Sequence, residues 1–166
     1  MKYEIRHEFE QDADSVAVAM LDPELAAFLT ENMPSILEME LLERKEEPDT
    51  ITRRVRYRIH PVIEKIGPKK IPPEAFEWVE HSTYDRKRRV MTYENIPTKA
   101  KIRKLFENFG EIRLTERGSG CARVMSGELR IRFPLLGGLA EKMIYKKAAE
   151  ILEEEHTALQ KFLSRS

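Results

Sequence analysis

The chain has 166 residues, of which 41% are apolar and 35% charged, and its formal net charge is zero. These values describe an ordinary soluble domain with a heavily charged surface. No window is long and apolar enough to span a membrane, and the polar, alternating N-terminus is unlike a signal sequence. Because Cys121 is the only cysteine, an internal disulfide is excluded. We expect a single domain over residues 1–166, located in the cytoplasm.

The zero net charge conceals an uneven distribution. Residues 53–104 hold 15 basic against 6 acidic side chains, whereas the rest of the chain holds 14 basic against 23 acidic. The basic half could favour anionic headgroups, nucleic acid or an acidic partner. Alternatively, strands and loops present Lys and Arg to water while the helices carry the Glu. Nucleic acid is the remote choice, because no recognisable motif or exposed interleaved aromatics accompany the arginines.

The N-terminal region predicts one strand and two short helices. Residues 2–9 alternate between apolar and charged side chains, which is typical of a half-buried strand. Asp12 or Asp14 can cap a first helix, and Pro23 begins a second one at its first turn.

Six further segments predict strands, at residues 36–44, 51–61, 75–84, 88–95, 102–116 and 121–133. In the second of these, Arg54, Arg56 and Arg58 share a face with His60 that we place outside, so Arg53 is the unusual member of the apolar face. Between the second and third segments, residues 62–73 are rich in proline and predict a loop or a single helical turn.

The C-terminal region predicts one long amphipathic helix from Leu139 to Leu163. Gly137 and Gly138 permit the sharp change from strand to helix. The apolar stripe follows the 3.6-residue period through Ala140, Ile144, Ala148, Ile151, Leu152, Leu159 and Phe162. Such a stripe needs a large apolar surface, for which the concave face of a curved antiparallel sheet is suited.

This order of elements resembles the START-like helix-grip superfamily, and the chain looks nearest to an uncharacterised bacterial branch of it. The most specific local match is the segment 133–142, FPLLGGLAEK, and the other matches are YEIRH at 3–7, MLDPE at 20–24 and the strand with Trp78. The resemblance implies an α+β fold with a seven-stranded curved antiparallel sheet around the long C-terminal helix and two short helices after the first strand. It also implies a hydrophobic cavity between sheet and helix. It transfers no catalytic set and no cofactor, so function must be argued from the cavity.

The expected function is binding or transport of a lipid or another hydrophobic small molecule without chemistry. Apolar walls with a few polar groups are the usual make-up of such a site. The candidate lining residues are Tyr3, Ile5, His7, Leu37, Met39, Arg53, Val55, Tyr57, Trp78, Arg123, Met125, Leu129, Ile131, Met143 and Ile144. The same side chains could instead fill a core without a cavity, which would leave a ligand-free interaction domain.

Two arginines on inward faces need a partner, because an unpaired buried charge is costly. Arg53 or Arg123 could bind a carboxylate or phosphate of the ligand. The alternative is an internal pair with Glu80 or Glu94, depending on the register of the strands.

A cyclase- or hydratase-like enzyme is the alternative function, with His7 as acid or base and Tyr57 as helper. The other histidines have no partner at metal-ligand spacing, and one cysteine makes a structural zinc site improbable, so no metal is expected. The glycine pairs lack the context of a phosphate-binding loop, so no nucleotide cofactor is expected.

Residues 62–73 are the most suggestive surface segment, because apolar side chains alternate with lysines. As a portal, this segment could contact an anionic bilayer transiently. As a lid, it would pack its isoleucines inward and turn its lysines to water. The residues concerned are Ile63, Lys65, Ile66, Lys69, Lys70 and Ile71.

Overall fold

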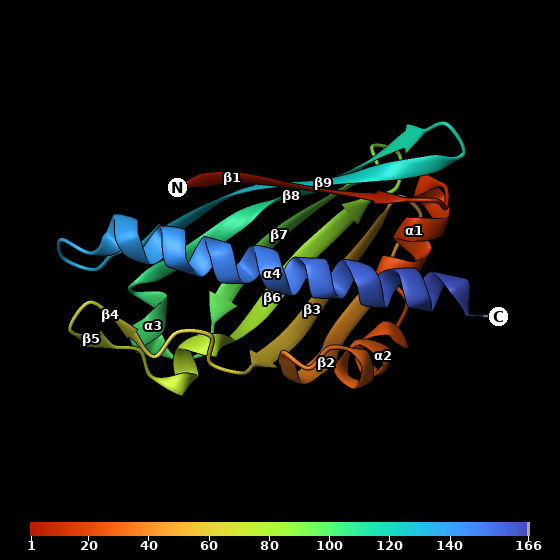
Figure 1. Ribbon diagram of the computed structural model, residues 1–166. Helices are drawn as coiled ribbons and strands as arrows, with labels where there is room; N and C mark the ends of the chain where they lie inside the picture. Colours follow the sequence, from red (N-terminus) through yellow and green to blue (C-terminus); the bar gives the residue numbers. More distant parts are fainter. Residues whose placement is uncertain (166) are drawn as a thin grey trace.

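The computed structural model describes residues 1–165 and has one long helix lying across a curved seven-stranded sheet (Figure 1). All neighbouring strands are antiparallel, in the order β1-β9-β8-β7-β6-β3-β2. The strands of this sheet are β1 (Lys2–Phe9), β2 (Ile36–Glu46), β3 (Thr50–Ile59), β6 (Glu77–Asp85), β7 (Val90–Pro97), β8 (Phe106–Arg117) and β9 (Gly120–Ile131). The helices are α1 (Ala13–Met20), α2 (Leu25–Asn32), α3 (Ala100–Arg103) and α4 (Gly137–Ser164). The expected helix-grip fold is confirmed.

Helix α4 lies on the concave face but does not cover it evenly. Its closest contacts are with β9 and β1 along one side of the sheet and with α1 and α2 at its C-terminal end. There Ala158, Leu159 and Phe162 are buried, and the Phe162 ring meets that of Phe28 edge to face at 5.1 Å. Burying side chains as large as Leu159 and Phe162 contributes roughly 1.5–3 kcal/mol each. The helix is therefore anchored at one end and along one edge of the sheet.

Some boundaries differ from the sequence-based expectations. Ile102 lies in α3 and not in a strand, and β8 begins only at Phe106. Residues 62–73 contain a small hairpin of β4 (Lys65–Ile66) and β5 (Lys69–Lys70), followed by a 3₁₀ turn at Pro73–Phe76. The long helix begins at Gly137, two residues earlier than expected.

The start of α1 agrees with the sequence-based expectation, whereas α2 begins at Leu25, so Pro23 precedes its first turn and no side chain caps it. The Asp12 carboxylate accepts hydrogen bonds from the backbone N–H of Ser15 at 3.2 Å and from its hydroxyl at 2.6 Å, so Asp12 caps α1. Asp22 accepts from the N–H of Glu24 at 2.8 Å just before α2. Both short helices pack against α4, and Phe28 of α2 meets Phe162 near its C-terminal end.

The basic outer face of β3 is neutralised by its neighbour. Arg56 pairs with Glu38 and Glu40 of β2, and Arg58 also pairs with Glu38. Cross-strand pairs of this kind contribute about 0.2–1 kcal/mol each. The arginines of this strand are therefore matched by glutamates instead of forming an unopposed basic surface. Within residues 1–165, no helix is long and apolar enough to cross a membrane.

Candidate functional site

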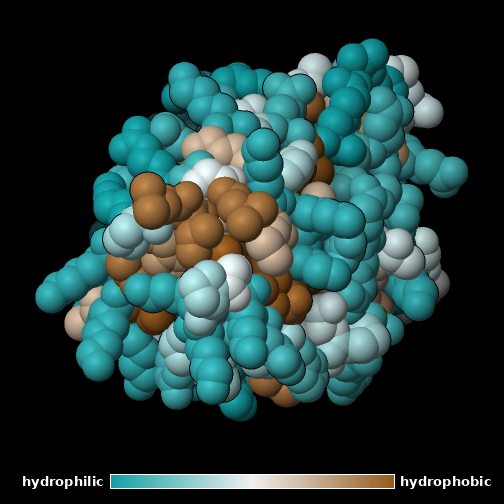
Figure 2. All heavy atoms as spheres, turned by 60° about the vertical axis from the view of Figure 1, so that its left-hand side comes forward, coloured by the Kyte–Doolittle hydropathy of each residue, from teal (hydrophilic) through white to brown (hydrophobic). Residues whose placement is uncertain are grey.

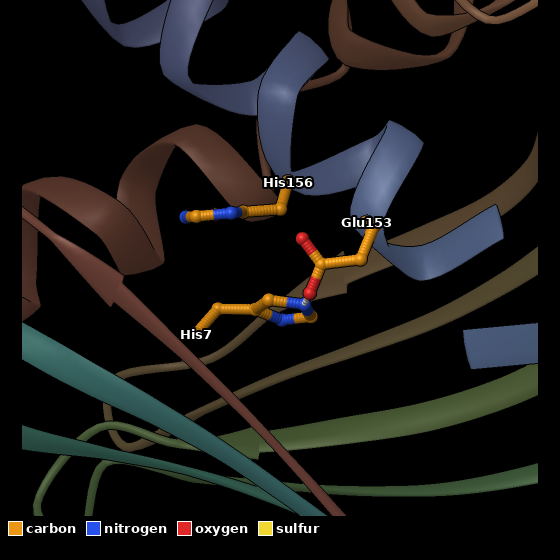
Figure 3. A group of neighbouring side chains, drawn as sticks. All are labelled: His7, Glu153 and His156. Carbon is orange, nitrogen blue, oxygen red and sulfur yellow. Dashed lines mark hydrogen bonds and ion pairs between the residues drawn. The ribbon is translucent and has the colours of Figure 1, made fainter. Parts of the chain in front are cut away.

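The first polar cluster on the concave face joins β1 to α4. His7 lies on β1, and Glu153 and His156 lie one turn apart on α4 (Figure 3). The His7 Nε2 atom is 2.9 Å from a Glu153 carboxylate oxygen, and the two imidazole rings stack with centroids 4.6 Å apart. His156 Nε2–H donates to the Glu8 carbonyl at 2.9 Å. This cluster holds the C-terminal half of the helix to the edge strand.

Two imidazoles and a carboxylate are also a ligand set for zinc or iron. The ligand atoms of His7, Glu153 and His156 lie within 4.8 Å of one another. However, Nη2 of Arg123 is 3.0 Å from His7 Nδ1, and a guanidinium can only donate. Nδ1 must therefore accept, which puts the proton of the neutral ring on Nε2. As arranged, His7 presents an N–H toward Glu153 and has no lone pair there for a metal.

Arg123 is neutralised inside the protein. Its Nη1 and Nη2 atoms donate to the two carboxylate oxygens of Glu155 on α4, each at 2.9 Å. The Arg123 side chain is 3% exposed and that of Glu155 is 17% exposed. Burial and then the neighbouring Arg123 charge lower the pKa of His7. His7 is thus held neutral with both ring nitrogens engaged, which leaves none free for acid–base catalysis.

Arg53 also finds its partners within the chain. It donates to the Met20 carbonyl at 3.0 Å and to the Ser82 hydroxyl at 3.4 Å, and it lies 3.5 Å from Glu80. Burial nevertheless raises the pKa of Glu80, against the opposing effect of Arg53. The register puts Glu80 on the concave face beside Arg53, whereas Glu94 is exposed. The expected internal pair with Glu80 is therefore found for Arg53, whereas Arg123 pairs with Glu155, a partner that was not expected.

A chain of hydrogen bonds crosses the concave face of the sheet from β1 to β7. The hydroxyls of Tyr3 and Tyr93 are 2.5 Å apart, and Asn108 Nδ2 donates to Tyr3 at 2.8 Å. Asn95 Nδ2 donates to Asn108 Oδ1 at 2.6 Å. The network needs the bare backbone of Gly127, since a Cβ there would stand 2.5 Å from the Tyr3 hydroxyl. In the described chain, Asn95 Oδ1 is buried without a hydrogen-bond partner.

The inner trough, as we name it, is the part of the concave face along β2, β3 and β6. It is formed by Met39, Val55, Tyr57, Trp78 and Glu80. The Tyr57 and Trp78 rings stack with centroids 5.3 Å apart and planes 15° apart. Met39, Tyr57, Trp78 and Glu80 are only partly buried although they face inward, so α4 does not close over this region.

Two polar groups of the inner trough have no partner in the protein. Among residues 1–165, neither the Tyr57 hydroxyl nor the Trp78 indole N–H makes a hydrogen bond, and neither atom is sealed from solvent. Burial raises the pKa of Tyr57 well above its usual value. Both groups thus lie among partly buried side chains and keep some contact with solvent. The trough therefore offers a mostly apolar wall with a hydroxyl, an N–H and a carboxyl on it.

The structure separates the sequence-predicted lining residues into groups. Met39, Val55, Tyr57 and Trp78 lie together in the inner trough, with Arg53 beside them. Leu37 is wrongly included, because it is exposed at a bulge of β2. His7 and Arg123 belong to the cluster that ties β1 to α4. The remaining lining residues are buried or partly buried around α4: Tyr3, Ile5, Met125, Leu129, Ile131, Met143 and Ile144.

The segment of residues 62–73 has the arrangement of a lid. Ile63 and Ile66 are 7% and 1% exposed and pack into the core, so neither is available to a membrane. Ile71 is partly buried, whereas Lys65, Lys69 and Lys70 are exposed. The lysines therefore face water above inward-packed isoleucines.

Sequence reasoning missed several polar residues that complete the concave face: Tyr93, Asn95, Asn108, Glu153 and Glu155. The two glutamates occur in a run of three, and only the rotation of the helix on the sheet decides which partner each one meets. The asparagines lie opposite one another on β7 and β8. The sequence did offer one signal, namely a polar residue at a position where the alternation of side chains along a strand predicts an inward-facing one.

One surface hollow, about 690 Å³, lies mainly on the opposite face of the sheet. Its lining includes Thr52, Arg54, His81, Thr83 and Phe109. Because these side chains point away from the concave face, this open hollow is a separate feature from the inner trough. A second hollow between α1 and the sheet has no room for a water molecule.

Comparison with solved structures shows the same fold along nearly the whole chain. An aromatase/cyclase from a Streptomyces strain is 16% identical with a TM-score of 0.66, over 99% of this chain and 95% of that one. Norcoclaurine synthase from Thalictrum flavum is 17% identical with a TM-score of 0.66, over 100% and 88%. A START superfamily protein from Mycobacterium smegmatis is 14% identical with a TM-score of 0.59, over 98% and 96%.

These similarities confirm the START-like resemblance for the fold, and their names include both enzymes and a protein named only by its superfamily. A search of curated proteins finds no match. At the level of sequence, residues 4–163 match the family described as protein of unknown function, DUF2505. Because this match spans almost the entire chain, the chain belongs to the DUF2505 family.

Proposed function

We propose that the chain binds an apolar small molecule, such as a lipid or a compound of similar polarity, in the inner trough and does not transform it. The observation that carries the proposal is the pair of unpartnered but accessible polar groups, the Tyr57 hydroxyl and the Trp78 indole N–H. Both stand on a wall that is otherwise mostly apolar. A ligand with an apolar body and one hydrogen-bonding end would satisfy them.

The charges of the site support a neutral ligand end in preference to an anionic one. Arg53 and Arg123 already have internal partners, so an added carboxylate would have to compete with Glu80 or Glu155. Glu80 lies on the same wall, 3.5 Å from Arg53, and can accept a hydrogen bond from the ligand. Asn95, directly opposite Glu80 on β7, holds a buried acceptor without a partner. A hydroxyl or carbonyl on the ligand fits this set of donors and acceptors.

The proposal can be tested by NMR, because Trp78 is the only tryptophan of the chain. One indole N–H signal then reports directly on the trough. We expect titration with naphthalene or 2-naphthol to shift this signal saturably. Tyr57→Phe should weaken 2-naphthol binding about two- to tenfold and leave naphthalene unchanged, since only 2-naphthol can use the lost hydroxyl.

Phe109→Ala, in the hollow of the outer face, is the matched control and should change neither titration. Tyr57→Phe should also leave the melting temperature unchanged, because the hydroxyl makes no bond within the protein. An indole signal that neither compound moves would contradict the proposal and favour a ligand-free interaction domain. Loss of binding in Phe109→Ala would assign the site to the outer face.

A proton-transferring enzyme is the second candidate, because of Glu80. A carboxyl whose pKa is raised by burial is what a general acid requires. It lies beside the accessible Tyr57 hydroxyl, so the two could act together on a bound apolar substrate. If this second function is correct, the Glu80→Gln variant should still bind a ligand identified in the inner trough but should no longer convert it. Binding without turnover by the natural chain would favour the carrier function.

A further inference from the structure

The end of the molecule where α4 begins carries an exposed apolar tip, formed by Phe133, Leu135, Leu136 and Leu139. Leu135 is fully exposed, and Leu139 is 49% exposed. Figure 2 shows apolar side chains gathered on the end of the molecule that comes forward in this view. Soluble proteins seldom expose contiguous large apolar side chains without a use for them. The tip therefore needs an occupant.

The backbone presents Leu135 to solvent at a cost. Its φ angle is 65°, in the left-handed region that a leucine rarely adopts. The loop is fixed on both sides, since the N–H groups of Leu136 and Gly137 donate to the Phe133 carbonyl at 3.2 and 3.0 Å. Strained backbone of this kind is kept where it serves function. Here it serves no packing role, because the Leu135 side chain is outside the core.

Exposed lysines occur on two segments next to the tip. Lys69 lies over the Phe133 ring at 5.5 Å, and Lys65 and Lys70 of the same hairpin are exposed. The segment after α3 joins the tip, because Arg132 N–H donates to the Leu105 carbonyl at 2.7 Å. The lysine rim, as we define it, consists of Lys65, Lys69, Lys70, Lys99, Lys101 and Lys104. None of the six forms an ion pair with any residue of 1–165, unlike the arginines of the outer sheet face.

We infer that this end of the molecule docks on an anionic lipid bilayer. Leu135 and Leu139 enter the boundary between headgroups and acyl chains, and the lysine rim meets the anionic headgroups. A protein partner fits less well, because lysine is depleted at protein interfaces and the segments next to the tip carry the six lysines of the rim. The isoleucines of residues 62–73 are buried and take no part in this docking surface. The inference is also independent of the proposed ligand site.

The inference is tested by flotation with vesicles of phosphatidylcholine alone or with phosphatidylglycerol. We expect binding to the anionic vesicles at low salt, weakening as salt rises. Leu135→Gly removes the side chain and relieves the strained φ angle, so the variant should bind about tenfold more weakly and melt no lower than the natural chain. Lys69→Gln with Lys70→Gln should lose about fivefold per lysine on anionic vesicles only.

Val18→Ser is the matched control, because Val18 is 68% exposed on α1 and lies away from the tip. It should bind as the natural chain does. If the natural chain stays unbound at low salt, or if Leu135→Gly binds as tightly as Val18→Ser, the inference is overturned. A third outcome is that the natural chain binds no vesicles but self-associates, and that Leu135→Gly abolishes this self-association. That result would assign the tip to contact between proteins instead.

Discussion

Arg123→Met should destabilise the protein strongly, because Arg123 is the centre of the contact between β9, β1 and α4. The substitution removes two hydrogen bonds of 2.9 Å to Glu155 and one of 3.0 Å to His7. It leaves the Glu155 carboxylate, only 17% exposed, without its cation. Breaking one side of a buried pair costs about 3–5 kcal/mol. For a chain of this length that corresponds to a fall in melting temperature of roughly 6–20 °C.

A double-mutant cycle with Glu155→Met separates this effect from lost packing. When both charges are removed, no unpaired charge remains, so the double variant should be less destabilised than the sum of the single ones. Urea denaturation at pH 7 gives the free energies of unfolding. An NMR titration adds a second readout, because the pKa of His7 should rise once the neighbouring cation is gone. Costs below about 1 kcal/mol for Arg123→Met, or strictly additive costs, would refute the reasoning.

The remaining predictions concern pH and packing. The pKa of His7 is lowered in the folded state, so the unfolded chain takes up a proton first as the pH falls below about 6.5. Thermal stability should therefore fall from pH 7 downward, and His7→Gln should flatten that slope; parallel melting curves for both proteins would contradict it. Gly127→Ala should cost about 1–3 kcal/mol, because its Cβ would stand 2.6 Å from the Phe109 carbonyl oxygen. Gly138→Ala, with nothing within 4 Å of the added Cβ, should be neutral or slightly stabilising in the same denaturation assay.

Much of the fold could be predicted from local patterns. The alternation in β1 and β3 and the 3.6-residue stripe of α4 fix which side chains face inward, so Arg53 and His7 were correctly placed on inward faces. The local patterns gave wrong predictions where a strand has a bulge or a short helix interrupts the chain. A bulge in β2 turned Leu37 outward, and α3 replaced the expected start of a strand at Ile102.

The polar partners could not be predicted, because they depend on contacts between distant segments. His7 meets Glu153 across 146 positions of sequence, and Arg123 meets Glu155 only because α4 lies on β9 in one particular rotation. Neither the rotation of a helix nor the register of seven strands follows from periodicity alone. For the same reason the inward pairing of Glu80 and the outward position of Glu94 were left open by the sequence.

The most direct test of the proposed carrier function is native mass spectrometry of the chain purified without detergent, followed by solvent extraction of whatever it holds. We expect a complex of one chain with one mostly apolar molecule that has a hydroxyl or carbonyl end. The same molecule, added back to stripped protein, should shift the single Trp78 indole signal. A bare polypeptide mass in every preparation, or a bound molecule that leaves the Trp78 signal unmoved, would contradict the assignment of the inner trough as the ligand site.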